Sequence, residues 1–172
     1  LDEERYGYTL LYHTLFPSIT ISKIVGLFGA IDQRIGHPLR KMFDFFDGVF
    51  FSGWEDIHPM GFNQSEEDEG TFIFTLVTSG IFLLCPYMDE IDYVKFPDLM
   101  SEKERKSLSA YYKSSIQRFM YAQGSDKVFL SKNVMSTGKL NTIIEMKKKK
   151  KIVYIVRSPY AAVPSFISMF SA

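Results

Sequence analysis

The sequence is short of the residues that build several common kinds of site. Its single cysteine, Cys85, excludes an internal disulfide and any metal site made of several cysteines, and it leaves the compartment open. The 3 histidines show no metal-ligand spacing, and neither a Gly-rich dinucleotide motif nor a Walker lysine motif occurs. Because 20 basic residues balance 20 acidic ones, a bulk attraction to nucleic acid is not expected.

Long apolar runs are also lacking. A bilayer-spanning helix needs roughly 20 apolar residues, and the best candidates, Ile24–Ile31 and Ile81–Pro86, are far shorter. The charged start Leu1–Arg5 is unlike a signal peptide. What the chain does have is a 46% hydrophobic and 16% aromatic composition over 172 residues. We therefore expect one globular domain, residues 1–172, with a bulky core.

Helical periodicity and capping residues predict several helices. Apolar residues at helical spacing favour a helix from Ser22 to about Ile35, and a second helix begins at Pro38. Ser101 and Glu104 form a capping box that opens a long amphipathic helix, which Gly124 ends.

A second capping box is expected at Ser65, followed by the acids Glu66–Glu69. It predicts a helix from Glu66 to Leu84 that is apolar almost all round and therefore deeply buried.

The C-terminal third alternates between strand and helix patterns. Lys127–Ser131 and Lys151–Val156 read as short buried strands, and each is followed by a helical segment. This alternation is typical of a parallel βαβ unit. The predicted class is therefore α/β, predominantly helical, with a short parallel sheet flanked by helices.

Both predicted strands end at a basic residue, Lys132 and Arg157. Ligands of open parallel sheets bind beyond the carboxyl ends of the strands, where helix N-termini also favour anions. Ser165 falls within the first turns of the last helix and could add a hydroxyl donor. The pattern predicts a phosphate site; the alternative is that Arg157 is a solvated strand end and Ser165 a small packing residue.

Three motifs, taken from the C-terminal one backwards, resemble PAPS-dependent sulfotransferases, in the branch found in bacteria, fungi and protists. The first is a strand ending in Arg157, with Pro159 and with Ser165 eight residues after the arginine. The second, Leu130–Asn133 ("LSKN"), is similar to the Lys-Asn-Pro or Lys-Ser-Pro element of that branch. The third is His58-Pro59 followed by the acids 66–69 ("EEDE"). Together they cover about residues 55–170.

The chain departs from the family pattern in two places. The Gly/Ser/Thr-rich loop that binds the 5′-phosphosulfate is not present, and the chain is expected to start just after it. Where the family has a turn similar to "FPDA", this sequence has the lysine run Lys147–Lys151. The resemblance is therefore to a partial P-loop-like sulfotransferase fold.

The resemblance implies PAPS as co-substrate, with Arg157 and Ser165 holding its 3′-phosphate and Lys132 near the donor phosphates or the transferring sulfuryl group. His58, or a carboxylate among Glu66, Glu67 and Asp68, would take the proton of a hydroxyl or amine acceptor. No metal is required, and the acceptor stays open. The alternative interpretations are that His58 has only a structural role and that the acids only stabilise a helix N-terminus.

A different class of function remains open beside this one. Without the phosphosulfate loop, the chain could be a catalytically inactive, truncated sulfotransferase-like binding module. Its aromatic helices would then lack cover, and we expect an exposed apolar patch and association into a homo-oligomer. An ATP-using relative of P-loop kinases is a weaker interpretation because no Walker lysine motif occurs.

Overall fold

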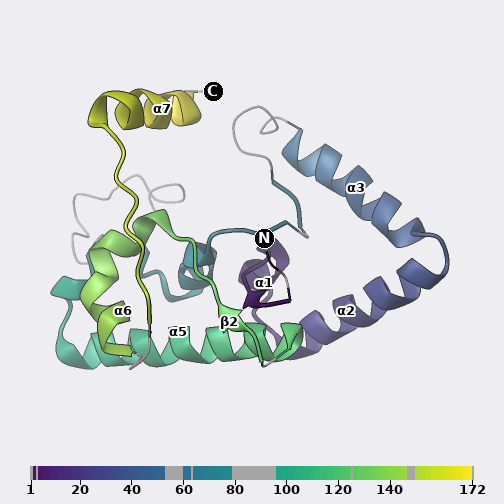
Figure 1. Ribbon diagram of the computed structural model, residues 1–172, viewed down its shortest axis with the longest axis horizontal. Coiled ribbons are helices and arrows are strands. Elements are labelled where there is room, and N and C mark those ends of the chain that lie inside the picture. Colours follow the sequence, from purple (N-terminus) through teal and green to yellow (C-terminus); the bar gives the residue numbers. More distant parts are fainter. Residues whose placement is uncertain are drawn as a thin grey trace.

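The structure is a computed structural model that describes residues 2, 4–52, 60–62, 64–78, 96–124, 126–146 and 150–171. It is mostly helical, with one short sheet of two parallel strands (Figure 1). In chain order the elements are β1 (Tyr6–Gly7), α1 (Leu11–Leu15), α2 (Ile19–Arg34), α3 (Pro38–Phe51), the 3₁₀ helices η1 (Asp68–Thr75) and η4 (Pro97–Leu99), α5 (Glu102–Gln123), β2 (Val128–Phe129), the 3₁₀ helix η5 (Val134–Lys139), α6 (Leu140–Met146) and α7 (Pro159–Ser171).

The long helix α5 is the base on which the core is built. Its predicted capping box is confirmed: the Glu104 backbone N–H donates to the Ser101 hydroxyl, and the Ser101 N–H donates to the Glu104 carboxylate at 3.0 Å. The helix ends at Gly124, whose φ of 106° suits a residue without Cβ. One face carries the buried residues Leu108, Tyr112, Ser115, Ile116 and Phe119.

The core forms where η1 and α6 pack on that face of α5. Phe72 of η1 is 1% exposed and lies against Leu108, Tyr112 and Ile116. Half-buried apolar residues surround this cluster: Val77, Met120, Phe129, Ile143 and Met146. Figure 1 shows α5 along one side of the molecule, with α1 and α6 above it.

The parallel sheet is not the one that the sequence predicted. The segment Lys127–Ser131 does contain a strand, β2, but its partner is β1, with Tyr6 opposite Val128 and Gly7 opposite Phe129. Residues 151–156 form no strand, so the predicted unit of strand, helix and strand across residues 127–156 is wrong. The β-branched run was misleading because its side chains, Ile155 among them at 86% exposure, lie in solvent, where a strand has neither a partner nor a buried face.

The predicted helix Glu66–Leu84 is also wrong over its described part. Ser65 forms an antiparallel bridge with Leu10 in place of an N-cap, and the helix that follows is the 3₁₀ helix η1. Leu76, with a positive φ of 56°, ends η1, and Phe74 of this helix is 56% exposed. Residues 79–84 lie outside the described residues.

Helices α2 and α3 form an arm: α2 leads away from α5, and the chain turns back through α3 (Figure 1). Both were expected, although α2 starts earlier, at Ile19 after the N-cap Ser18. Between them, Gly36 and His37 adopt the left-handed conformation, and Pro38 opens α3 as predicted. None of the fourteen residues of α3 is buried.

The C-terminal segment, residues 150–171, crosses the molecule and ends in α7, the helix expected there. No described side chain between residues 150 and 168 is buried. Among the described helices none combines the length and hydropathy that a membrane span requires.

Candidate functional site

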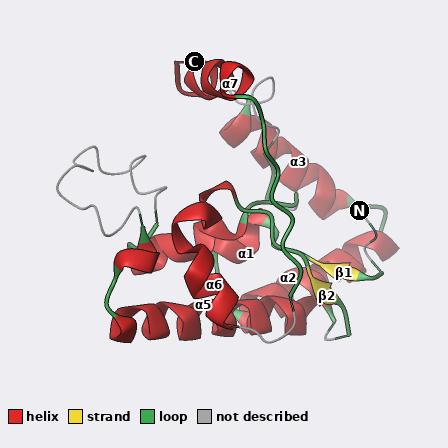
Figure 2. Cartoon of the chain, turned by 60° about the vertical axis from the view of Figure 1, so that its left-hand side comes forward, coloured by secondary structure: helices red, strands yellow, loops and turns green. Residues whose placement is uncertain are grey.

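The carboxyl edge of the sheet gathers three segments that are far apart in sequence. Because β1 and β2 are parallel, the residues that follow them, Thr9-Leu10 and Ser131–Asn133, leave the same edge. The acidic segment 64–69 lies against both: the Glu66 N–H donates to the Thr9 carbonyl at 2.9 Å, and the Asp68 N–H donates to the Lys132 carbonyl at 3.4 Å. Figure 2 shows the two strands side by side at one end of the molecule.

Asp68 is the centre of this edge. Its carboxylate accepts hydrogen bonds from the Ser131 hydroxyl and the Asn133 amide, both at 2.7 Å, and from the Tyr112 hydroxyl. The residue is 1% exposed. Burial raises the pKa of Asp68, and the hydrogen bonds of Tyr112, Ser131 and Asn133 and the charge of Lys139 oppose that rise. A carboxylate without these donors would be costly at this depth.

Glu69 and Lys139 form a buried ion pair beside Asp68. Glu69 also accepts from the Asn133 amide at 2.8 Å and from the Thr78 hydroxyl. The Lys139 ammonium lies 3.8 Å from the centre of the Phe72 ring. Burial lowers the pKa of Lys139, and the neighbouring carboxylates of Glu69 and Asp68 act in the opposite direction.

We call these residues the sheet-edge cluster: Asp68, Glu69, Tyr112, Ser131, Asn133 and Lys139. Asn133 joins its two halves, because one amide nitrogen donates to Asp68 and to Glu69. The Asn133 side-chain oxygen accepts from the Met135 N–H at 2.8 Å and so caps η5. The side chain that begins η5 therefore also fixes the acidic segment.

Glu67 and Lys132 lie at the rim of the cluster. Their charged groups are 3.4 Å apart, and the Lys132 side chain is 68% exposed. Glu66, half-buried, uses one carboxylate oxygen to accept the N–H of Glu67 at 2.8 Å. Three of the predicted site residues, Glu66, Glu67 and Lys132, are thus brought together at a solvent-accessible edge.

The other predicted site residues lie elsewhere. Arg157 is exposed in the extended segment before α7, and Ser165 is exposed on α7 itself. Arg157 therefore does not end a strand of the sheet, which corrects the expectation of two neighbouring strand tips. His58 lies outside the described residues.

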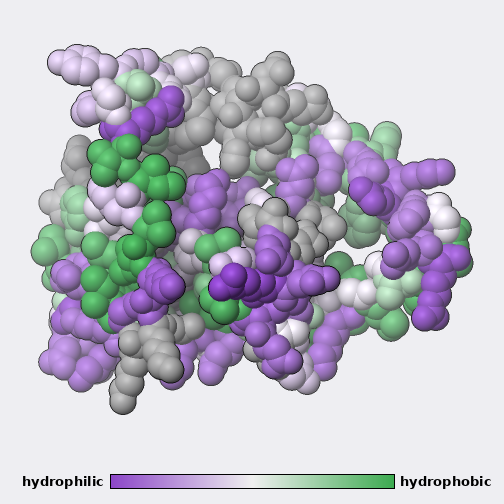
Figure 3. All heavy atoms as spheres, viewed as in Figure 1, coloured by the Kyte–Doolittle hydropathy of each residue, from purple (hydrophilic) through white to green (hydrophobic). Residues whose placement is uncertain are grey.

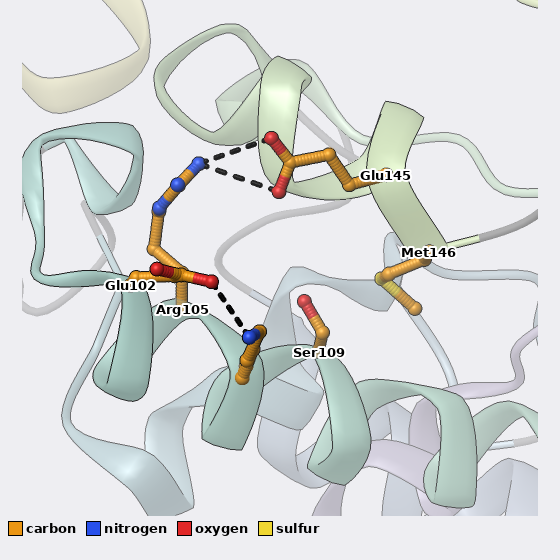
Figure 4. Close-up of a pocket in the computed structure, with 6 residues that line it drawn as sticks. Glu102, Arg105, Ser109, Glu145 and Met146 are labelled. Carbon is orange, nitrogen blue, oxygen red and sulfur yellow. Dashed lines mark hydrogen bonds and ion pairs between the residues drawn. The ribbon is translucent and has the colours of Figure 1, made fainter.

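A surface hollow of about 320 Å³ lies between α5 and α6 (Figure 4). Its charged side chains pair with one another: Arg105 donates to Glu145 at 3.3 and 3.4 Å, and Lys106 lies 2.6 Å from Glu102. The hydrogen bond from Lys106 lowers the pKa of Glu102. Since no predicted site residue lines it, the hollow is a weaker candidate than the sheet edge.

Sequence reasoning missed Tyr112 and Lys139, and it gave no role to Ser131 and Asn133 of the "LSKN" motif. Tyr112 and Lys139 stand in amphipathic helical patterns, where a tyrosine and a lysine are ordinary. Asn133 had a usable signal, because an asparagine just before a helix is a favoured N-cap. Nothing in the sequence indicates that Lys139 is 2% exposed.

No protein-family model, curated protein or solved structure matches the chain, so the geometry of the sheet edge carries the functional argument.

Proposed function

We propose that this chain binds PAPS and transfers its sulfuryl group to a hydroxyl or amine acceptor, with the reaction at the carboxyl edge of the sheet. One observation carries the proposal. The two motifs "EEDE" and "LSKN", more than sixty residues apart, meet there and place the Lys132 ammonium 3.4 Å from the Glu67 carboxylate. The edge of a parallel sheet where its strands end is also the usual ligand site of α/β proteins.

The chemistry assigned to the rim follows from the two charges. In sulfuryl transfer, the bond between sulfur and the donor's 5′-phosphate oxygen breaks, and a bond between sulfur and the acceptor oxygen or nitrogen forms. Lys132 stabilises the negative charge that develops on the leaving phosphate. A carboxylate of Glu67 or Glu66 takes the acceptor's proton. His58 is an alternative base.

The sheet-edge cluster holds this pair in place. Asp68 and Glu69 immediately follow Glu67, and Ser131 and Asn133 flank Lys132, so hydrogen bonds between the four flanking residues fix both rim residues at their backbones. Catalysis by alignment and electrostatics requires such support, because small misplacements of the reacting groups reduce the rate greatly.

The 3′-phosphate is assigned to Arg157 and Ser165. Ser165 lies seven residues along the helix from Ser158, which accepts the first backbone N–H bonds of α7. Seven residues make about two helical turns and about 10 Å, so Ser158 and Ser165 share a face. The exposed arginine next to Ser158 is long enough to approach an anion on that face. The assignment of one phosphate to both side chains rests on the resemblance and on the exposure of both residues.

For the fold, we propose that β1 and β2 belong to a P-loop-like sulfotransferase sheet. The parallel pairing is compatible with it. In that case, the loop for the 5′-phosphosulfate does not belong to the segments that carry the resemblance, about residues 55–170.

Calorimetric titration tests the nucleotide assignment. We expect adenosine 3′,5′-bisphosphate to bind about ten- to hundredfold more tightly than adenosine 5′-monophosphate, since a charge-assisted hydrogen bond contributes roughly 1.5–3 kcal/mol. Arg157→Ala should remove the difference, whereas Lys151→Ala, which deletes an exposed cation of the same segment, should leave it. Equal binding of the two nucleotides by the unaltered chain contradicts the assignment.

A binding module without catalysis is the second candidate. The observation in its favour is that every described residue from 150 to 168 except Ala162 is exposed, and this segment carries the phosphate residues. An assay for transfer of radiolabelled sulfate from PAPS to a panel of alcohols and amines distinguishes the enzyme from the binding module. If the 3′-phosphate preference is present but no product forms, and Lys132→Ala leaves nucleotide binding unchanged, the module is the better description.

A further inference from the structure

The arm formed by α2 and α3 presents an apolar surface that the proposed reaction does not use. Exposed apolar residues recur at helical spacing on α2 and its C-cap Ile35, and the same holds on α3: Ile24, Leu27, Phe28, Ile31 and Ile35, then Met42, Phe43, Phe46, Val49 and Phe50. We call these ten residues the arm stripe. Each of them is between 41% and 64% exposed. Intervals of three and four residues are those by which helices pack against other helices.

The arm is held in one shape. At its base, the Lys23 ammonium lies 4.5 Å from the centre of the Tyr121 ring and donates to the Tyr121 hydroxyl at 3.2 Å, which joins α2 to α5. At its bend, the buried carboxylate of Asp32 accepts the N–H groups of Leu39 and Arg40 at 2.6 and 3.2 Å. One carboxylate at the end of α2 thus caps the start of α3.

The far end of α3 is anchored as well. Asp47 accepts the N–H of Phe62 at 3.1 Å, and the rings of Phe50 and Phe51 meet the ring of Phe62 edge to face. With both ends and the bend tied down, the apolar residues are presented on a pre-organised surface, which lowers the entropy cost of docking. Figure 3 shows apolar residues of this arm open to view, interspersed with polar ones.

The geometry points to a second copy of this chain as the occupant, packed stripe to stripe in a symmetric dimer. A large apolar residue presents on the order of 170–200 Å² when fully exposed, so the ten half-exposed residues offer roughly 900 Å². A stable interface of standard size takes about 800 Å² from each partner. The stripe alone is therefore large enough for an isologous contact, in which the same surface serves both copies.

The charges of the arm favour this occupant over a lipid surface. Helices that lie on membranes carry an excess of lysine and arginine on their polar face. Here four cations, Lys23, Arg34, Arg40 and Lys41, are nearly matched by three anions, Asp32, Asp44 and Asp47. A nearly neutral surface with both signs is compatible with a copy of itself and has little attraction for anionic lipid.

Sedimentation equilibrium of the full chain between 1 and 100 µM tests the dimer. The expected result is a monomer–dimer equilibrium with a dissociation constant of about 10 µM or tighter, as for interfaces of standard size and modest complementarity. Phe46→Asp, at the middle of the stripe on α3, and Leu27→Asp on α2 should each weaken it at least a hundredfold. Ile155→Asp, an equally apolar residue that is 86% exposed outside the arm, should leave it unchanged.

The other outcomes overturn the proposal. Far-ultraviolet circular dichroism first verifies that each variant is folded. A wild-type monomer at 100 µM, or a dimer that both aspartate variants preserve, excludes the arm stripe as a dimer interface. A monomer that binds vesicles of phosphatidylserine and phosphatidylcholine, and loses that binding in Phe46→Asp, assigns the surface to lipid.

Discussion

The sheet-edge cluster and the arm invert the usual distribution of residue types. At the sheet edge, two carboxylates and a lysine are buried: Lys139 pairs with Glu69, and the Asn133 amide donates to both Asp68 and Glu69. On the arm, phenylalanines and isoleucines lie in solvent, and α3 buries none of its residues. Buried ionic groups tolerate few alternative arrangements, because each lost partner leaves a charge in the interior. Exposed apolar residues are tolerated singly, but as a stripe they indicate an interaction surface.

The comparison predicts that removing a charged partner lowers the free energy of unfolding most where the ion pair is buried. Lys139→Met removes the partner of Glu69 and leaves two buried carboxylates, so we expect a loss of about 3–5 kcal/mol in the free energy of unfolding. Lys106→Met breaks the exposed pair with Glu102 and should cost at most about 1 kcal/mol. Urea unfolding followed by circular dichroism measures both. Similar losses in the two variants would contradict the burial of Lys139.

Removing a single hydroxyl should also lower the free energy of unfolding more at a buried position than at an exposed one. Tyr112→Phe deletes one donor to Asp68 and should destabilise the chain by about 1–3 kcal/mol, because the carboxylate stays buried. Tyr121→Phe deletes an exposed hydroxyl that accepts from Lys23, and a change within about 0.5 kcal/mol is expected. The same urea titration compares them, and equal stability of Tyr112→Phe and the unaltered chain would argue against the hydrogen bond.

Acid should destabilise the core through His13. This side chain is 0% exposed, its Nδ1 accepts the N–H of Leu10 at 3.3 Å, and its ring stacks on Phe119. Burial lowers the pKa of His13 from 6.5 to about 4. The unfolded chain therefore binds a proton at higher pH than the folded chain does. The stability from the neutral imidazole is complete above pH 6.5 and is lost progressively as the pH falls toward 4.

The expected slope for this one group is at most about 1.4 kcal/mol per pH unit. The variant His13→Asn keeps a hydrogen-bond acceptor at this position, but its side chain does not bind a proton between pH 7 and 4. The difference between the pH profiles of the two proteins, measured by urea unfolding from pH 7 to 4, isolates the histidine from the carboxylates. Parallel profiles would mean that His13 is accessible to protons in the folded chain.

The smallest effect is expected from an arm residue outside the stripe. Phe45 is 67% exposed, so Phe45→Ser should change the free energy of unfolding by no more than about 0.5 kcal/mol. Phe72→Ala, at the centre of the core, should cost about 3–5 kcal/mol. Thermal and urea unfolding of the two variants would sharpen the contrast, and a large loss from Phe45→Ser would show that the arm surface is covered.

The sequence signals that succeeded were local ones. The capping box Ser101–Glu104, the stop at Gly124 and the start at Pro38 depend on residues within one helical turn, and the structure has all three. The strand at Val128–Phe129 was also found, although Val128 is 58% exposed and not buried as predicted. For the candidate site, the sequence motifs identified the acids Glu66 and Glu67 and the cation Lys132. The structure shows that Lys132 lies close to Glu67.

The signals that failed needed a partner elsewhere in the chain. Ser65 looked like an N-cap but pairs with Leu10, and the run at residues 151–156 looked like a strand but has no strand beside it. Lys139 and Tyr112 carry no local sign of their role, because burial and ion pairing depend on which segments meet.

By itself, the sequence determined the positions of most helices and the residue types available for chemistry, because helix capping, periodicity and turn formation act over a few residues. Only the tertiary structure decided which strand pairs with β2 and that the acidic segment meets Ser131–Asn133. Those outcomes depend on contacts between residues tens of positions apart, where the free energy of burial and the pairing of charges are settled by the whole fold.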